Sequence, residues 1–150
     1  AIPNVAITTG LIAGFPGETE EEFAESLAFT HETEFAGGHV FTYSPRSGTG
    51  AAKMRGQIRH EVRKKRNHIL QDALEQSAKT YRQRFIGQTM SVLWESTSEV
   101  GEWGWQMEGL SENYLRVSAF VPSPRWNEID SVKINDFDRS TSRGVISDTG

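Results

Sequence analysis

Two apolar segments near the start of the chain predict strands. Residues 5–15 (VAITTGLIAGF) are rich in β-branched and apolar side chains with little polar alternation. This pattern is typical of a strand buried on both faces of a parallel sheet. Residues 39–44 (HVFTYS) predict a second strand. With a helix between them, the two segments form a βαβ unit, whose strands are parallel and whose crossover is right-handed.

The helix between the strands is expected over about residues 19–34, because ring and apolar side chains recur there at spacings of four, at Phe23, Leu27 and His31. Thr19 followed by Glu22 has the pattern of a capping box. The three successive acids of the first turn suit the positive end of a helix, which explains them better than paired-carboxylate catalysis does. Gly37 and Gly38 are expected to end the helix.

A loop and a long helix come next. Residues 45–57 have no clear period and contain three glycines, so they predict a long loop, which is uncommon without a function. Residues 58–84 predict a helix with an apolar side formed by Val62, Ile69, Ala73, Leu74 and Tyr81. Its other side carries Arg59, Arg63, Lys64, Lys65 and Arg66.

The pattern changes after residue 84. Five short β-rich pieces, MSVLWES, WGWQMEG, YLRVSAF, DSVKIND and RGVIS, are separated by glycine, proline, asparagine and serine. They predict a small all-β barrel or sandwich. The sequence thus predicts an α/β unit over residues 1–84 and an all-β domain over residues 85–150. One strand pair with two helices cannot complete an α/β barrel or an open sheet, so the first unit is interpreted as the end of a larger domain.

Composition narrows the class of protein. The 150 residues are 36% hydrophobic, and no run reaches the ~18 apolar residues of a membrane span. No basic, apolar leader begins the chain, so a cytoplasmic setting is expected. The sequence contains no cysteine, which excludes disulfides and thiolate-held clusters formed by this chain itself. The missing initiator methionine suggests a piece of a longer protein.

Charge is distributed unevenly along the chain. Residues 1–52 hold one basic residue, Arg46, against seven acids, and residues 87–150 hold five basic residues against ten acids. Residues 53–86 hold ten basic residues against three acids. A basic segment between two acidic ones suggests contact with a polyanion, although on charge alone a solvated helix face explains it better.

Two glycine-containing loops are candidates for a ligand site. Residues 14–17 (GFPG) follow the first predicted strand, and residues 44–49 (SPRSGT) follow the second. The carboxyl ends of parallel strands meet at one rim, so the two loops are expected to share a site. Glu18 follows Gly17 where a P-loop needs lysine, and the G-x-G-x-x-G spacing is absent. A ligand-binding loop and a structural turn both remain open.

The two loop motifs carry a resemblance. "TTGLIAGFPGETEEEF" followed by "HVFTYSPRSGTGAAKM" resembles the last strands of the radical S-adenosylmethionine (SAM) methylthiotransferases, and the β domain resembles the RNA-binding TRAM domain that ends these enzymes. "HVF" before "YSPR", and "GLSENYLRV", look most like the members acting on threonylcarbamoyladenosine in tRNA. The implied fold is α/β plus all-β: the last βαβα units of a radical SAM partial barrel, followed by a five-stranded OB-like TRAM barrel.

The resemblance implies methylthio transfer to carbon 2 of adenosine 37, beside the tRNA anticodon. The implied cofactors are SAM and two [4Fe–4S] clusters, with the cluster-binding domains lying upstream in the parent polypeptide. A chain without cysteine is then expected to be inactive alone. Two departures from the family pattern stand out: Gly10 where aspartate is usual, and Gly50 where proline would stiffen the loop.

The resemblance also assigns site residues. The SAM side of the rim would be formed by Gly14, Phe15, Pro16, Gly17 and Glu18. Phosphate contacts are expected from a basic set, concentrated at the domain junction: Arg46, Lys53, Arg55, Arg59, Arg63, Lys64, Lys65 and Arg66. Barrel aromatics are candidates for stacking on anticodon-loop bases, with only one or two expected to be exposed: Trp94, Trp103, Trp105, Tyr114, Phe120 and Trp126. His39 is expected to be a packed strand residue without a metal.

Three other functions remain open. A free-standing RNA-binding module of the TRAM type would need no cofactor. A methylthiotransferase acting on a ribosomal protein, or one acting on isopentenyladenosine in tRNA, would share the loop motifs. A membrane partner is not expected.

Overall fold

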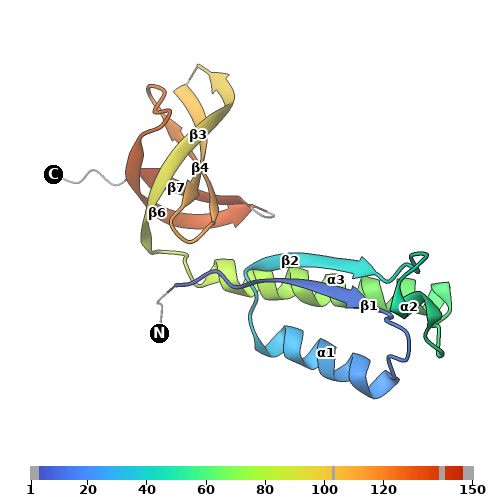
Figure 1. Cartoon of the computed structure of the whole chain (residues 1–150). Helices are drawn as coiled ribbons and strands as arrows, with labels where there is room; N and C mark the ends of the chain where they lie inside the picture. The colour runs from blue at the N-terminus through green and yellow to red at the C-terminus, as the bar shows by residue number, and fades with distance from the viewer. Residues whose placement is uncertain (1–3, 103, 139–140, 147–150) are drawn as a thin grey trace. The chain divides into compact units, whose positions relative to one another are not determined.

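A computed structural model describes residues 4–102, 104–138 and 141–146 (Figure 1). The described residues divide into two compact units, one formed by residues 7–81 and the other by the remainder. The first is α/β and the second all-β, as the sequence predicts. No helix in the described part of the chain is long and apolar enough to span a membrane.

The α/β unit is a βαβ motif followed by two helices. The strands β1 (Thr8–Ala13) and β2 (Gly37–Thr42) form a parallel two-stranded sheet. The helices are α1 (Glu20–Glu32), α2 (Gly50–Lys53) and α3 (His60–Gln83). The parallel pairing confirms the predicted βαβ unit, and the short helix α2 lies inside the segment predicted to be a loop.

Local sequence signals explain where α1 begins. The Thr19 hydroxyl accepts a hydrogen bond from the Glu22 amide at 3.1 Å, and the Glu22 carboxylate accepts one from the Thr19 amide at 2.9 Å. These reciprocal bonds are the predicted capping box. They satisfy two amide groups that the first turn of a helix otherwise leaves without partners.

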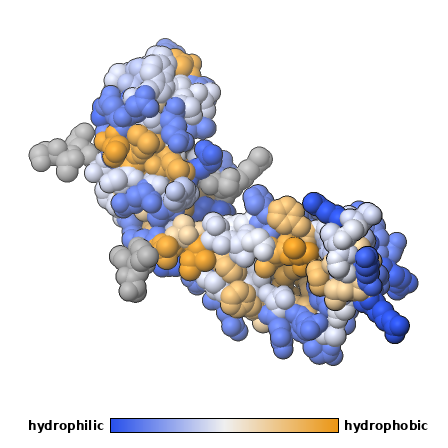
Figure 2. Space-filling model, in the orientation of Figure 1, coloured by the Kyte–Doolittle hydropathy of each residue, from blue (hydrophilic) through white to orange (hydrophobic). Residues whose placement is uncertain are grey.

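The helices of the α/β unit cover one face of the sheet. On that face Ala13 packs with Phe23 of α1 and Leu70 of α3. On the other face Ile12 is 57% exposed and Phe41 is 59% exposed. The prediction of a first strand buried on both faces is therefore wrong for the described residues, because nothing among them covers this second face. Figure 2 shows hydrophobic residues at the surface of this unit.

The second unit is a closed five-stranded barrel with the order β3-β4-β5-β7-β6. Its strands are β3 (Thr89–Gly101), β4 (Gly104–Ser111), β5 (Arg116–Val121), β6 (Ile129–Asp138) and β7 (Thr141–Ile146). Five strands are found where five β-rich pieces predict them. The predicted piece for β3 ends at residue 96, but the strand continues to Gly101, because its pairing with β4 goes on past two register shifts.

The barrel encloses its own core. Inward-facing side chains alternate along β3 at Met90, Val92 and Trp94, each at most 4% exposed. The Trp94 indole N–H donates a hydrogen bond to the Asp130 carboxylate at 2.7 Å, which satisfies its buried polar atom. Arg125 pairs with the same carboxylate, so the aromatic core is tied to the β5–β6 connection.

Candidate ligand site at the ends of the parallel strands

The loops that follow β1 and β2 lie together at one end of the sheet. The Tyr43 amide donates a hydrogen bond to the Ala13 carbonyl at 2.9 Å, which extends the strand pairing to the rim. The rings of Phe15 and Tyr43 pack edge to face, with their centroids 5.4 Å apart. The two loops thus share a rim, as parallel strands require.

A hollow of about 400 Å³ opens between the two loops. This volume lies in the usual range for small-molecule sites. Its walls come from both loops and from the open face of the sheet: Ile12, Phe15, Phe41, Thr42, Tyr43, Ser44, Arg46, Thr49 and Ala51. Arg46 is the only charged side chain in this lining. The Tyr43 hydroxyl is buried and has no hydrogen-bond partner in the described part of the chain.

The backbone between β1 and α1 is a closed turn. The Gly14 amide donates to the Glu18 carboxylate at 2.9 Å, and the Glu18 amide donates to the Phe15 carbonyl at 3.0 Å. The Gly17 amide donates to the Gly56 carbonyl at 2.9 Å. Because these three amides already have acceptors, the loop presents the Phe15 side chain to the hollow rather than a set of free N–H groups.

The five residues predicted to bind a cofactor are divided between two hollows. Phe15 lines the hollow between the two loops and also a second, more acidic one. Pro16, Gly17 and Glu18 line only the second, together with Glu22, Glu25 and Ser26. Gly14 is buried behind the loop against Arg63. Phe41 and Tyr43 were missed as lining residues, although their i, i+2 spacing in HVFTYS was a signal that both face one side of the sheet.

Gly14 and Gly17 give a matched test of how closely this turn is packed. Both have φ in the left-handed region, at +74° and +89°. A Cβ at Gly14 would lie 2.3 Å from the Arg63 Cγ, whereas a Cβ at Gly17 meets nothing within 4 Å. We expect Gly17→Ala to cost about 1 kcal/mol of unfolding free energy from backbone strain alone, and Gly14→Ala to cost about 2–4 kcal/mol because overpacking is added.

Urea unfolding of the two variants measures this difference. Equal losses for Gly14→Ala and Gly17→Ala would contradict the close packing of Arg63 over the turn.

The predicted RNA-binding residues fall into two groups. Six are exposed: Arg46, Lys53, Arg55, Arg59, Lys64 and Lys65. Arg63 is half-buried and Arg66 is only 5% exposed, so the structure does not support phosphate contact by these two. The basic residues at positions 63–66 lie in the first turns of α3, and the chain passes from the first unit to the second near the end of this helix. The expectation that RNA contact is concentrated at the domain junction stays a prediction.

Arg66 is held by acidic partners on the β1–α1 turn. Its guanidinium lies 2.6 Å from the Glu18 carboxylate and 2.6 Å from the Glu20 carboxylate. Burial lowers the pKa of Arg66, but the hydrogen bonds and charges of Glu20 and Glu18 outweigh it and raise the pKa above its ordinary value. Arg66 is thus a permanently charged, internally paired side chain.

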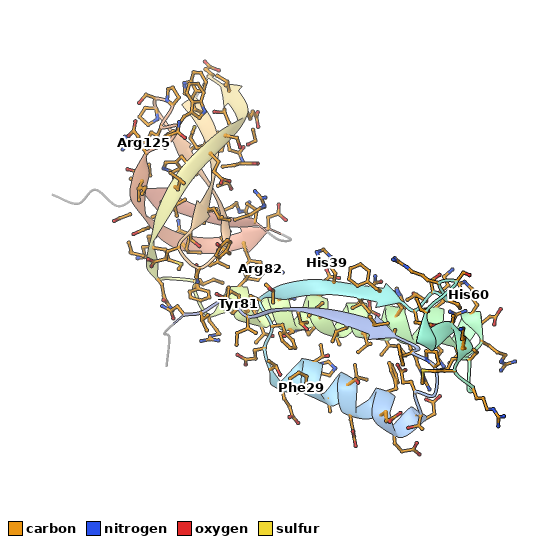
Figure 3. All side chains as sticks on the ribbon, viewed as in Figure 1. Phe29, His39, His60, Tyr81, Arg82 and Arg125 are labelled. Carbon is orange, nitrogen blue, oxygen red and sulfur yellow. The ribbon has the colours of Figure 1, made fainter. Side chains whose placement is uncertain are left out.

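His39 is exposed on the open face of β2, where the centroid of its ring lies 6.1 Å from that of Phe41, rather than packed as predicted (Figure 3).

Gly10 lies opposite His39 in the register. A Cβ at Gly10 meets nothing within 4 Å, so the site has room for the aspartate of the family pattern. The described residues contain no group of three or more side chains that could hold a metal ion.

The barrel exposes more aromatic side chains than predicted. Trp94 is buried and Trp105 half-buried, but Tyr114, Phe120 and Trp126 are all exposed. Three exposed rings exceed the expected one or two, and Trp103 lies outside the described residues. The Trp126 indole donates a hydrogen bond to the Thr97 hydroxyl at 3.0 Å. Its ring packs edge to face on that of Trp105, with the centroids 5.6 Å apart, so these two contacts hold the exposed ring in position.

Comparison with known proteins identifies the family. No family model matches the sequence. The chain is 38% identical over 117 residues to a threonylcarbamoyladenosine tRNA methylthiotransferase of Bacillus subtilis. The aligned segment covers 78% of this chain and 26% of that protein. It is 43% identical over 99 residues to a tRNA-2-methylthio-N(6)-dimethylallyladenosine synthase of Geobacillus kaustophilus, covering 66% of this chain and 19% of that protein. A synthase of the same name from Thermobifida fusca is 46% identical over 93 residues, a segment that covers 62% of this chain and 19% of that protein.

The chain belongs to the radical SAM tRNA methylthiotransferase family. It spans only about a fifth to a quarter of the length of these relatives. An aligned length of 117 residues exceeds the α/β unit of residues 7–81, so the similarity continues into the barrel. Radical SAM methylthiotransferases use SAM and [4Fe–4S] clusters, and this chain contains no cysteine to hold a cluster.

Proposed function

We propose that this chain is the carboxyl-terminal part of a tRNA methylthiotransferase that modifies adenosine 37. Residues 1–84 would supply the last βαβα units of the radical SAM partial barrel, and residues 85–150 would be the TRAM domain. The observation that carries the proposal is the hollow between the loops after β1 and β2, in a chain related to these enzymes over both of its units. The cluster-binding domains would lie upstream, so this piece alone would be inactive.

The lining of the hollow fits SAM. The rings of Phe15, Phe41 and Tyr43 offer apolar faces for an adenine base and favourable contact for a sulfonium cation. Arg46 can pair with a carboxylate, and the unpartnered Tyr43 hydroxyl offers a hydrogen bond. When bound beside a reduced cluster, SAM supplies the deoxyadenosyl radical. The residues of this chain would hold and orient the cofactor, with Gly14, Pro16, Gly17 and Glu18 shaping the loop that carries Phe15.

The anticodon loop of tRNA would contact the exposed cations and the barrel. The six exposed basic residues would meet phosphates, while Tyr114, Phe120 and Trp126 could stack on unpaired bases. The barrel segment carries twice as many acidic as basic residues, so its contribution would come from stacking more than from charge.

Threonylcarbamoyladenosine is the proposed substrate nucleoside. The Bacillus subtilis relative named for this nucleoside matches the largest share of the chain among the three compared above, 78%. The dimethylallyladenosine synthases match a shorter segment at higher identity, which makes isopentenyladenosine the second candidate.

Mass spectrometry of tRNA nucleosides tests the proposed function. A strain lacking the gene should lose the 2-methylthio group on threonylcarbamoyladenosine and regain it when the full-length gene is returned. Loss of that group on isopentenyladenosine would instead select the second substrate. Intact tRNA with an unmodified ribosomal protein would overturn a tRNA substrate, and no change in either would favour the non-catalytic RNA-binding module.

A further inference from the structure

Two arginines of α3 reach the two rim loops from one helix face. Arg63 and Arg66 are three positions apart, so their side chains leave α3 on the same side. Both belong to a run of cations in which Lys64 and Lys65 are exposed. Burial therefore separates the two arginines from the two lysines between them.

Arg66 holds the turn after β1 at several points. One guanidinium nitrogen donates to the Glu18 carboxylate at 2.6 Å and to the Glu18 carbonyl at 3.0 Å, and the other donates to the Glu20 carboxylate at 2.6 Å. The guanidinium also lies over the Phe23 ring, 5.2 Å from its centroid. Since the second oxygen of Glu18 accepts the Gly14 amide at 2.9 Å, Arg66 is linked through Glu18 to the backbone at the end of β1.

Arg63 holds the other loop. Its guanidinium donates to the Tyr43 carbonyl at 2.5 Å, just beyond the end of β2. Its aliphatic stem passes over Gly14, where a Cβ would lie 2.3 Å from the Arg63 Cγ. One side chain therefore contacts both loops that line the hollow.

We propose that Arg63 and Arg66 are positioning residues that set the spacing of the two rim loops and so the shape of the hollow between them. Their guanidinium groups are engaged by the protein, so they do not bind RNA phosphates. Because the hollow is the proposed SAM site, the effect on SAM affinity rests on the proposed function. The effect of the two arginines on the loops does not depend on the proposed function.

A planar fork is needed at position 66. Arginine can bond Glu18 and Glu20 at the same time through two different nitrogens, whereas lysine offers a single charged nitrogen on a flexible stem. Arg66→Lys keeps the charge and loses this bridging geometry, so it separates positioning from charge. Lys65→Ala is the matched control, since it removes an exposed cation from the adjacent position.

The experiment uses the full-length protein that contains this chain, with Arg66→Ala, Arg66→Lys, Glu18→Gln and Lys65→Ala. Hydrogen–deuterium exchange of a peptide covering residues 11–18 reports the loop, and titrations with SAM and with tRNA report the two ligands. For Arg66→Ala we expect exchange in this peptide and the Kd for SAM each to rise by about tenfold, with the Kd for tRNA unchanged. Arg66→Lys and Glu18→Gln should show smaller changes in the same direction. Lys65→Ala should change neither the exchange of this peptide nor the Kd for SAM, and can raise only the Kd for tRNA.

Several outcomes would overturn the positioning role. Exchange of the residue 11–18 peptide that is unaltered in every Arg66 variant would do so, as would full restoration of wild-type values by lysine. Weaker tRNA binding with unaltered SAM binding would make Arg66 a phosphate contact, and raised exchange with unaltered SAM affinity would uncouple the loops from the hollow. If the wild-type protein binds no SAM, the proposed function fails, and amide exchange of residues 11–18 alone decides whether Arg66 positions the loop after β1.

Discussion

Replacing Lys53, Arg55, Arg59, Lys64 and Lys65 together with alanine should weaken tRNA binding by about a hundredfold. It should also make the negative slope of log affinity against log salt shallower by about 3. All five side chains are exposed at the start of α3 or just before it. Each phosphate contact releases condensed counterions, so a group of contacts is seen in the salt dependence as well as in the affinity. Filter binding over a range of potassium chloride concentrations measures both.

The control for this variant exchanges lysine and arginine at the same five positions, which keeps every charge. Its salt slope should match that of the unmodified protein. A five-alanine variant with an unaltered slope would show that these cations are only a solvated helix face, and RNA contact would then have to be sought on the barrel.

Trp94→Ala should lower the free energy of unfolding of the barrel by about 3–5 kcal/mol. Trp94 is fully buried, and its loss leaves a large cavity and removes the donor to Asp130. Trp126→Ala is the matched control, because Trp126 is also a barrel tryptophan with a bonded indole but is 49% exposed. That variant should cost less than about 1.5 kcal/mol. Denaturant unfolding followed by near-UV circular dichroism compares the two, and equal losses would contradict the assignment of Trp94 to the core.

The local elements could be read from the sequence because their signals are local. Thr19 and Glu22 form the predicted capping box three residues apart. The βαβ unit follows from two apolar runs with a helix between them, and the barrel strands follow from turn residues between β-rich pieces. In each case the sequence signal that marks the element lies within a few residues of it.

The predictions that failed depend on distant contacts. Arg66 and Lys65 are adjacent cations of one helix, and the approach of the β1–α1 turn, with Glu18 lying 48 positions from Arg66, decides which of them is buried. The strands that carry Ile12 and Phe41 are as apolar as strands whose two faces are both covered. The sequence alone therefore does not show that these two side chains are exposed, because their exposure depends on what packs against the sheet. The β3 strand extends past its predicted end because pairing with β4 continues across register shifts.

The central claim is that the hollow between the two rim loops binds SAM, and two matched phenylalanines test it most directly. Phe41 lines the hollow and is 59% exposed, whereas Phe29 lies on α1, outside the hollow lining, and is 58% exposed (Figure 3). In the full-length protein, isothermal titration calorimetry should show that Phe41→Ala raises the Kd for SAM by at least about fivefold, through loss of a stacking surface, and that Phe29→Ala leaves it unaltered. Equal effects of the two substitutions, or SAM binding that Phe41→Ala does not weaken, would contradict the account.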